Sequence, residues 1–102
     1  MRIISGINKG RKIQAPKNLP VRPTTDQSKE ALFNIISNDY DLSKISILDL
    51  FSGTGNISYE FFSRGTKNIT CVDLNGRCIN FIKSISNNLS FNLKIIKSDV
   101  YK

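Results

Sequence analysis

The sequence predicts an α/β fold, with an N-terminal β-hairpin followed by a partial Rossmann-like domain that has a parallel sheet. Three apolar, β-favouring runs, at residues 45–51, 68–74 and 91–99, alternate with helical patterns and are joined by short turns. A loop with two glycines follows the first run. Strands that alternate with helices in this way form a parallel sheet with right-handed crossovers. We expect the hairpin and its connector in residues 1–25 and the Rossmann-like part in residues 26–102.

The first quarter of the chain has the pattern of a hairpin and an extended connector. Residues 2–15 contain two short β-favouring runs, with Asn8, Lys9 and Gly10 between them as the turn. All three prolines of the chain lie in residues 16–23. This segment should therefore form neither a helix nor a central strand.

A helix is predicted directly after the connector. Thr24 is placed as its N-cap, with Gln27 three residues later as in a capping box, and the helix should end at about Ser37. The apolar residues at helical spacing are Leu32, Ile35 and Ile36, with Ala31 beside them, and they are expected to face the core.

Two further helices should connect the strands. One covers residues 56–64, with Gly65 as its C-cap. The other is indicated by Ile79, Ile82 and Ile85, together with Phe81. The strand between them, at residues 68–74, has a continuous apolar centre, which is typical of a strand covered on both faces.

Positive charge is concentrated at the N-terminus. The formal net charge is +7, and all eight acidic residues lie between Asp26 and Asp99. The first 25 residues are free of carboxylates and contain six basic residues: Arg2, Lys9, Arg11, Lys12, Lys17 and Arg22. A solvated basic arm could have this composition, but such an uneven distribution favours a nucleic-acid partner.

The composition also restricts the chemistry. Because the chain has no histidine, Ser-His and Cys-His nucleophilic catalysis and histidine-based proton transfer are excluded. The spacing of Cys71 and Cys78 does not suggest zinc, so we expect no metal and two reduced thiols in a cytoplasmic protein. The polar N-terminus is unlike a signal peptide, and no apolar run reaches membrane-spanning length.

The glycine loop lies in residues 49–60, "DLFSGTGNISYE". At the carboxyl end of a strand, Gly53 and Gly55 permit a sharp turn and the close approach of a ligand. A dinucleotide loop would have a third glycine where this chain has Ser58. Asp49 at the strand end is also a poor neighbour for pyrophosphate, whereas it suits a ligand with an ammonium or sulfonium group.

Aspartates follow the other two predicted strands as well. Asp73 ends the second strand, where a carboxylate can accept hydrogen bonds from ribose hydroxyls, and Asp99 ends the third. Any one of these residues alone could be a turn former or helix cap. Together with Asp49 and the glycine loop, they indicate a ligand with an amino-acid cation, a ribose and an adenine but no phosphate. S-adenosylmethionine is such a ligand.

With these residues in view, the chain resembles the RsmD-type methyltransferases, which methylate the N2 amine of a guanine in small-subunit ribosomal RNA. "MRIISGINKGRKIQAP" resembles the N-terminal hairpin of that family, and "RPTTDQSKEALFNII" resembles its distinctive next segment. "LDLFSGTGNISYEFFSRG" and "VDLN" resemble its cofactor loop and its ribose-binding strand end. The resemblance covers essentially the whole chain and implies a class I methyltransferase domain.

The resemblance implies roles for individual residues. Asp49, Ser52, Gly53, Thr54 and Gly55 would surround the methionine part of the cofactor, Asp73 would hold its ribose and Asp99 would lie near its adenine amine. The segment from Arg22 to Asp26, including Thr24 and Thr25, would close over the cofactor. Arg2, Lys9, Arg11 and Lys12 would meet the ribosomal RNA backbone, in the assembled or assembling small subunit.

One departure from the family pattern matters for activity. Family members carry a later Asn/Asp-Pro-Pro-Phe/Tyr motif that grips the target amine and stacks on the flipped base. The present sequence has no Pro-Pro pair and no proline after Pro23, and Tyr101 comes too early to serve. We therefore expect a fragment or truncated product that binds the cofactor but is inactive alone.

Two other functions stay open from the sequence. A non-catalytic RNA-binding module would keep the basic hairpin and the cofactor fold but would have lost the chemistry. A nicotinamide-dependent oxidoreductase is disfavoured by Asp49 and by the missing third glycine.

Overall fold

Three parallel strands and three helices make up the regular structure. The computed structural model describes residues 1–17, 19 and 25–99. In chain order the elements are α1 (Asp26–Asp39), β1 (Ser46–Leu50), α2 (Asn56–Ser63), β2 (Asn68–Asp73), α3 (Gly76–Leu89) and β3 (Lys94–Lys97). The strands pair in the order β1-β2-β3, and both pairs are parallel. The α/β class predicted from the alternation of patterns is confirmed.

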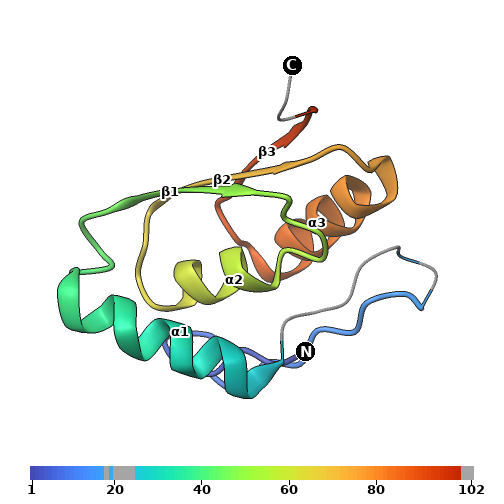
Figure 1. The fold of residues 1–102 in the computed structure, drawn as a ribbon. Coiled ribbons are helices and arrows are strands. Elements are labelled where there is room, and N and C mark those ends of the chain that lie inside the picture. The colour runs from blue at the N-terminus through green and yellow to red at the C-terminus, as the bar shows by residue number, and fades with distance from the viewer. Residues whose placement is uncertain (18, 20–24, 100–102) are drawn as a thin grey trace.

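In the described part of the chain the helices lie on one side of the sheet, and α1 lies beyond α2, farther from the strands (Figure 1). Figure 1 shows α1, α2 and α3 on the same side of the three strands. Strand residues facing the helices, such as Ile69 and Cys71 in β2 and Ile47 and Ile95 beside them in the register, belong to the core cluster or pack against it. In the described part of the chain no helix lies on the other side of β2, so the expected cover on both faces is not met there, although Val72, which points to that side, is buried.

The face that α1 buries differs from the prediction. Lys29 and Phe33 are its buried residues, whereas Leu32 and Ile35 are exposed. Phe33 packs edge-on against Phe61 of α2, with ring centroids 4.5 Å apart. The rotation of the helix is therefore set by Phe33 and by a buried lysine rather than by the expected apolar residues, of which only Ile36 packs against the core.

The ends of α1 and α2 are each displaced by a residue or two from their predicted places. Thr24 lies outside the described residues, and the N-cap is Thr25, whose hydroxyl accepts a hydrogen bond from the Ser28 amide at 3.2 Å. Helix α1 ends at Asp39, two residues beyond the prediction. The C-cap of α2 is Arg64 rather than Gly65, which follows it with a φ of 108°. Such left-handed residues normally stand just after the cap.

The prediction for α3 is confirmed. Ile79 and Ile82 are buried, and Phe81 and Ile85 pack against the core. Asn75 caps the helix by accepting hydrogen bonds from the amides at positions 77 and 78.

The N-terminal hairpin has little regular pairing of its own. Its two segments are joined by one antiparallel bridge, Arg2 with Lys12, and by backbone hydrogen bonds between residues 1–3 and 10–13. Ile3 and Ile13 are buried members of the core cluster. The hairpin thus packs directly on the helices. The boundary between a hairpin part, residues 1–25, and a Rossmann-like part, residues 26–102, stays a prediction.

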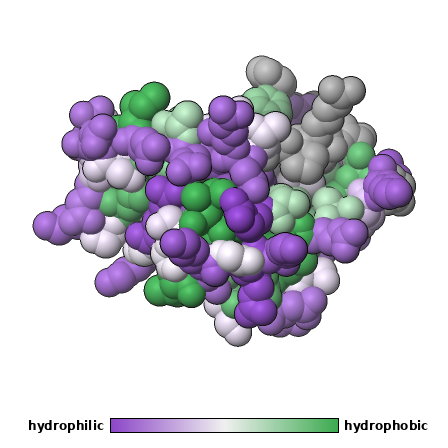
Figure 2. Space-filling view, turned by 90° about the horizontal axis from the view of Figure 1, so that it is seen from below, coloured by the Kyte–Doolittle hydropathy of each residue, from purple (hydrophilic) through white to green (hydrophobic). Residues whose placement is uncertain are grey.

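The surface below the helices, seen in Figure 2, is mainly hydrophilic with scattered small hydrophobic areas. In the described part of the chain, no helix has the length and apolar character needed to cross a membrane.

Candidate functional site

The loop between β1 and α2 is fixed by hydrogen bonds to β2. The Ser52 hydroxyl donates to the Asp49 carbonyl at 2.7 Å and accepts from the Val72 amide at 3.0 Å. The Ser52 amide in turn donates to the Val72 carbonyl at 2.9 Å. These bonds carry the backbone past the end of β1 and across to the neighbouring strand, and they give the loop a defined shape.

Gly55 is required by the geometry of this loop. It is the N-cap of α2 with a φ of 83°, a left-handed conformation that costs glycine little. A Cβ at this position would lie 2.6 Å from the ring of Tyr59, which is fully buried beneath it. Only glycine therefore fits, which explains one of the two glycines by packing rather than by ligand binding.

Asp73 joins two loops at the carboxyl end of the sheet. One carboxylate oxygen accepts the Gly53 amide at 2.8 Å, and the other accepts the Asn75 amide at 2.8 Å. Its carbonyl accepts the Ser98 amide at 3.0 Å, which keeps the end of β3 beside it. Each carboxylate oxygen can accept a second hydrogen bond. Asp73 thus orders the glycine loop and keeps acceptor capacity for a ligand hydroxyl.

Asp49 is a partly buried carboxylate beneath the loop. It accepts a hydrogen bond from the Ser58 hydroxyl at 2.6 Å, and Ser58 in turn accepts from the Cys71 thiol at 3.1 Å. Desolvation raises the pKa of Asp49, hydrogen bonds from Ser58 and Ser52 oppose this, and the charge of Asp73 adds to it. The two carboxylates therefore already repel each other and would favour a cation between or beside them.

The three aspartates lie at successive strand ends but not at one level. Asp49 is opposite Cys71 in the register, and Asp73 is opposite Lys97. Asp73 lies two residues beyond Cys71, the residue opposite Asp49. Asp99 likewise lies two residues beyond Lys97, the residue opposite Asp73. The row of carboxylates is therefore oblique to the sheet edge, with Asp49 deepest.

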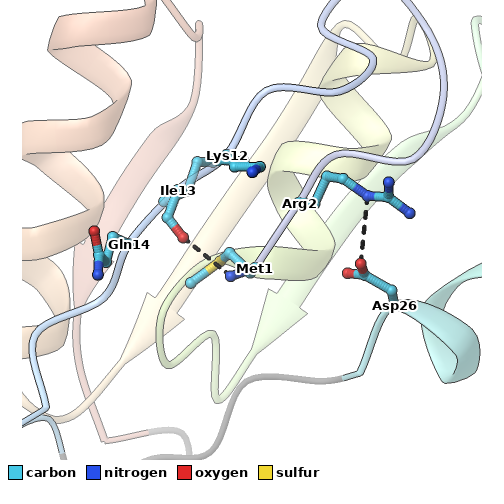
Figure 3. Close-up of a pocket in the computed structure, with 6 residues that line it drawn as sticks. All are labelled: Met1, Arg2, Lys12, Ile13, Gln14 and Asp26. Carbon is cyan, nitrogen blue, oxygen red and sulfur yellow. Dashed lines mark hydrogen bonds and ion pairs between the residues drawn. The ribbon is translucent and has the colours of Figure 1, made fainter.

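The basic residues of the hairpin fall into two groups. Lys9 and Arg11 are exposed at and beside the turn. Arg2 and Lys12 line a pocket of about 730 Å³ together with Met1, Ile13, Gln14 and Asp26 (Figure 3). Arg2 forms an ion pair with Asp26 at 3.4 Å, which ties the hairpin to the start of α1.

The segment expected to close over the cofactor is only partly described. Arg22 and Thr24 lie outside the described residues. The hydroxyl of Thr25 caps α1 and donates to the Ser28 hydroxyl at 2.9 Å. Thr54 of the loop is buried.

A buried ion network that the sequence analysis missed fastens the hairpin to the helices. The side chains of Lys29 and Glu60 are fully buried and lie 3.2 Å apart. The Lys29 ammonium also donates to the Arg2 carbonyl and, at 2.8 Å, to the Asn56 side chain. Asn56 is the first residue of α2, directly after the glycine loop.

Glu60 completes this network from the other side. Its two oxygens accept the amides of Ile4 at 2.9 Å and Ser5 at 3.1 Å, and Arg64 donates to it at 2.7 Å. Burial alone would raise the pKa of Glu60, but the Ile4 amide, Arg64 and Lys29 together lower it. Lys29 lies four residues before Phe33, so the two side chains share the face of α1 that packs against α2.

Comparison with known proteins now identifies the family. A family described as "Conserved hypothetical protein 95" matches residues 1–102, the whole chain. This chain belongs to that family. It is 37% identical over 100 residues to Ribosomal RNA small subunit methyltransferase D of Buchnera aphidicola subsp. Baizongia pistaciae. This match covers 97% of the present chain and 50% of the relative. The protein of the same name from Haemophilus influenzae is 35% identical over 97 residues, covering 95% of this chain and 46% of the relative.

Solved structures agree with the fold. A hypothetical protein of Thermus thermophilus superimposes with a TM-score of 0.85 at 21% identity, over 99% of this chain and 57% of that one. The resemblance to RsmD-type enzymes is confirmed by the named relatives. The partial Rossmann-like fold is confirmed by the parallel sheet with its helices and by likeness to a putative methyltransferase of Escherichia coli, with a TM-score of 0.82 and 27% identity over 97% of this chain and 52% of that one. The chain spans about half the length of the curated relatives that it matches.

Proposed function

We propose that this chain supplies the cofactor-binding part of an S-adenosylmethionine-dependent enzyme that methylates the N2 amine of a guanine in small-subunit ribosomal RNA. The observation that carries the proposal is the glycine loop held between two carboxylates, Asp49 beneath it and Asp73 bonded to its Gly53 amide. A pyrophosphate would be repelled there, whereas a cationic, ribose-bearing ligand would be attracted. The names of the relatives support the reaction and the substrate class.

Each part of the site has a role in this proposal. Asp73 accepts the ribose hydroxyls with the acceptor capacity that its two backbone bonds leave. Asp49 balances the positive charge of the methionine part, which Ser52, Gly53, Thr54 and Gly55 surround, and Asp99 lies near the adenine amine. The cofactor supplies an electrophilic methyl group, so the protein's task is to orient the reacting groups. Arg22, Thr24 and Thr25 would close the site.

The basic hairpin would bind the RNA. Arg2, Lys9, Arg11 and Lys12 would contact phosphates, which supply affinity and position but little sequence information. Because Lys29 and Glu60 fasten the hairpin to α2, RNA held there would have a fixed placement relative to the glycine loop. In the proposed function this reaction takes place in the cytoplasm, on the assembled or assembling small subunit.

Calorimetry on the 102-residue chain tests the proposal. S-adenosylhomocysteine should bind with a 1:1 stoichiometry, and NAD should not bind. RNA binding without S-adenosylhomocysteine binding would instead support the non-catalytic module. NAD binding would support the oxidoreductase.

We further expect no methyl transfer by this chain alone, because the motif that presents the target base is absent from its sequence. Incubation with radiolabelled S-adenosylmethionine and small ribosomal subunits should leave the RNA unlabelled. Label in the RNA would show that the 102 residues are a complete enzyme.

Replacing Asp49 by Asn should stabilise the free chain and weaken cofactor binding. Because the pKa of Asp49 is raised in the folded state, its contribution to stability is present at low pH and is lost as the pH rises through that pKa. The Asn variant avoids this loss, so its melting temperature should exceed that of the wild type at neutral pH but not in acid. Removal of the charge should weaken S-adenosylhomocysteine binding about tenfold. Thermal-shift curves across pH and calorimetry check both results, and a lower melting temperature at every pH would contradict the first.

A further inference from the structure

A line of three polar side chains connects the protein core to the glycine loop. The Cys71 thiol of β2 donates to the Ser58 hydroxyl of α2 at 3.1 Å, and this hydroxyl donates to the Asp49 carboxylate at 2.6 Å. Cys71 and Ser58 are fully buried, whereas Asp49 is only partly buried. We call this line the serine bridge. It ends on the carboxylate that the proposed function assigns to the positive charge of the ligand.

Ser58 occupies the position where a dinucleotide loop has its third glycine. That glycine allows the helix to pack closely on the strand, so a side chain there needs room on the strand side. In this protein Ser58 meets Cys71, a small residue, and the two side chains form a hydrogen bond. The serine is therefore built into the contact between α2 and β2.

The direction of the hydrogen bonds in the serine bridge follows from the chemistry of its members. An ionised carboxylate only accepts, so the single proton of the Ser58 hydroxyl points to Asp49. The Ser58 oxygen then accepts from the thiol. Burial raises the pKa of the Cys71 thiol, so the thiol keeps its proton at neutral pH and remains a donor. Of these three residues, only Asp49 is charged.

The serine bridge fixes one oxygen of this carboxylate. Oδ2 of Asp49 is held by the Ser58 hydroxyl in a short hydrogen bond to a charged acceptor, which is stronger than one between neutral groups. Carboxylate oxygens accept up to four hydrogen bonds in total, so acceptor capacity remains for a cation. Desolvation raises the pKa of Asp49, and the hydrogen bond from Ser58 opposes this effect. The serine thus acts on both the direction and the charge of Asp49.

Other polar groups near Asp49 do not replace this hydrogen bond. The Ser52 hydroxyl also lowers the pKa of Asp49, but it donates to the Asp49 backbone carbonyl and accepts from a backbone amide. Burial first, and then nearby negative charge, raise the pKa of Tyr59, so this residue stays neutral. Among the described residues its hydroxyl has no hydrogen-bond partner. Asp73 of β2 adds only repulsion.

We propose that Ser58, supported by Cys71, is a positioning residue that orients the Asp49 carboxylate toward a cationic ligand. The inference rests on the proposed function for the identity of that ligand, the amino-acid part of S-adenosylmethionine. Because Ser58 is fully buried, it acts through Asp49. Cys71 in turn acts through Ser58, whose oxygen it holds in place.

Calorimetry with S-adenosylhomocysteine measures the effect of Ser58 on the ligand. Ser58→Ala should weaken binding about fivefold at neutral pH, the effect of one hydrogen bond, and should have no further effect in an Asp49→Asn variant. Ser86→Ala is the matched control and should bind as the wild type does. Ser86 is also a buried helix serine, on α3, and its hydroxyl has no hydrogen-bond partner in the part of the chain that the structure describes.

Two substitutions of Cys71 separate hydrogen bonding from packing. Both Cys71→Ala and Cys71→Ser shrink a buried side chain and should lower the melting temperature, but only serine keeps a donor. Cys71→Ala should weaken S-adenosylhomocysteine binding about twofold, whereas Cys71→Ser should keep the wild-type affinity. In a Ser58→Ala variant, Cys71→Ala should change the affinity no further. Equal losses of affinity in folded Cys71→Ala and Cys71→Ser would contradict the role of the thiol, and this pair decides the question if Ser58→Ala does not fold.

A carbon-13 NMR titration of the Asp49 carboxylate in the ligand-free protein provides a readout that packing alone would not move. Ser58→Ala should raise the pKa of Asp49 above its wild-type value, because a hydrogen bond that lowers this pKa is lost, and Ser86→Ala should leave it unchanged. S-adenosylhomocysteine binding by Ser58→Ala should accordingly be lost at a higher pH than in the wild type.

An unchanged Asp49 pKa in folded Ser58→Ala would overturn the inference. A further loss of affinity from Ser58→Ala in the Asp49→Asn variant would also overturn it, because Ser58 would then act independently of Asp49. The titration needs no ligand, so it distinguishes the two proposals. If the pKa rises as expected but the wild type does not bind S-adenosylhomocysteine, the proposed function fails, whereas the control of Asp49 by Ser58 stands.

Discussion

Glu60→Leu is expected to unfold most of the protein or to lower its free energy of unfolding by about 3–5 kcal/mol, the usual cost of breaking a buried ion pair. The substitution leaves the fully buried Lys29 ammonium without its carboxylate. It also leaves the Ile4 and Ser5 amides without their acceptor. Domains of this kind have a total stability of about 5–15 kcal/mol, so the loss would be a large part of it.

Urea denaturation followed by circular dichroism measures this effect. Asp41→Asn is the matched control, because Asp41 forms an exposed ion pair with Lys44 at 4.0 Å, and such pairs contribute about 0–1 kcal/mol. The double variant Lys29→Met/Glu60→Leu should recover part of the loss, since an apolar pair can replace a buried ionic one. If Glu60→Leu costs no more than Asp41→Asn, the network does not hold the hairpin in place.

The same network predicts the response of the protein to acid. Because the pKa of Glu60 is lowered in the folded state, its contribution to stability is present at neutral pH. That contribution is lost as the pH falls from the unfolded-state pKa through the lowered folded-state pKa. The urea midpoint of the wild type should therefore fall in this acidic range, and the midpoint of Glu60→Gln should fall less.

Asp73→Ala is expected to weaken S-adenosylhomocysteine binding by about 100-fold or more. Hydrogen bonds to a charged group contribute about 1.5–3 kcal/mol each, and a ribose presents two hydroxyls. The substitution also removes the acceptor of the Gly53 and Asn75 amides, so the glycine loop would lose part of its order. Both effects act on the same ligand and in the same direction.

Calorimetry with Asp73→Ala, Asp73→Asn and Asp41→Asn separates these two contributions. Asp73→Asn keeps one side-chain oxygen and should give an intermediate affinity, whereas Asp41→Asn, remote from the loop, should bind as the wild type does. Circular dichroism shows whether each variant is folded. Unchanged affinity in folded Asp73→Ala would remove the proposed ribose contact.

Local patterns in the sequence were sufficient for the order of the elements and for the position of the glycine loop. The apolar runs that became β1, β2 and β3 are short, rich in isoleucine and separated by helical spacing, so their type depends little on distant residues. The same holds for α3, whose isoleucines face the core as expected. The candidate ligand residues Asp49 and Asp73 were predicted because strand ends can be read from the same runs.

Contacts between distant segments decided the rest. The buried face of α1 was predicted incorrectly because Lys29 finds its partner in Glu60, 31 positions later, and no local pattern reveals that pairing. Asp73 was expected at the ribose, but its bond to the Gly53 amide depends on how the loop crosses to β2. The exposure of Leu48 and Leu50 on one side of the sheet is also a tertiary property, because an apolar run looks the same whether one side of its strand is covered or both. The sequence therefore determined which residues form the strands and the loop, whereas packing determined which charges are buried and which side of the sheet remains available.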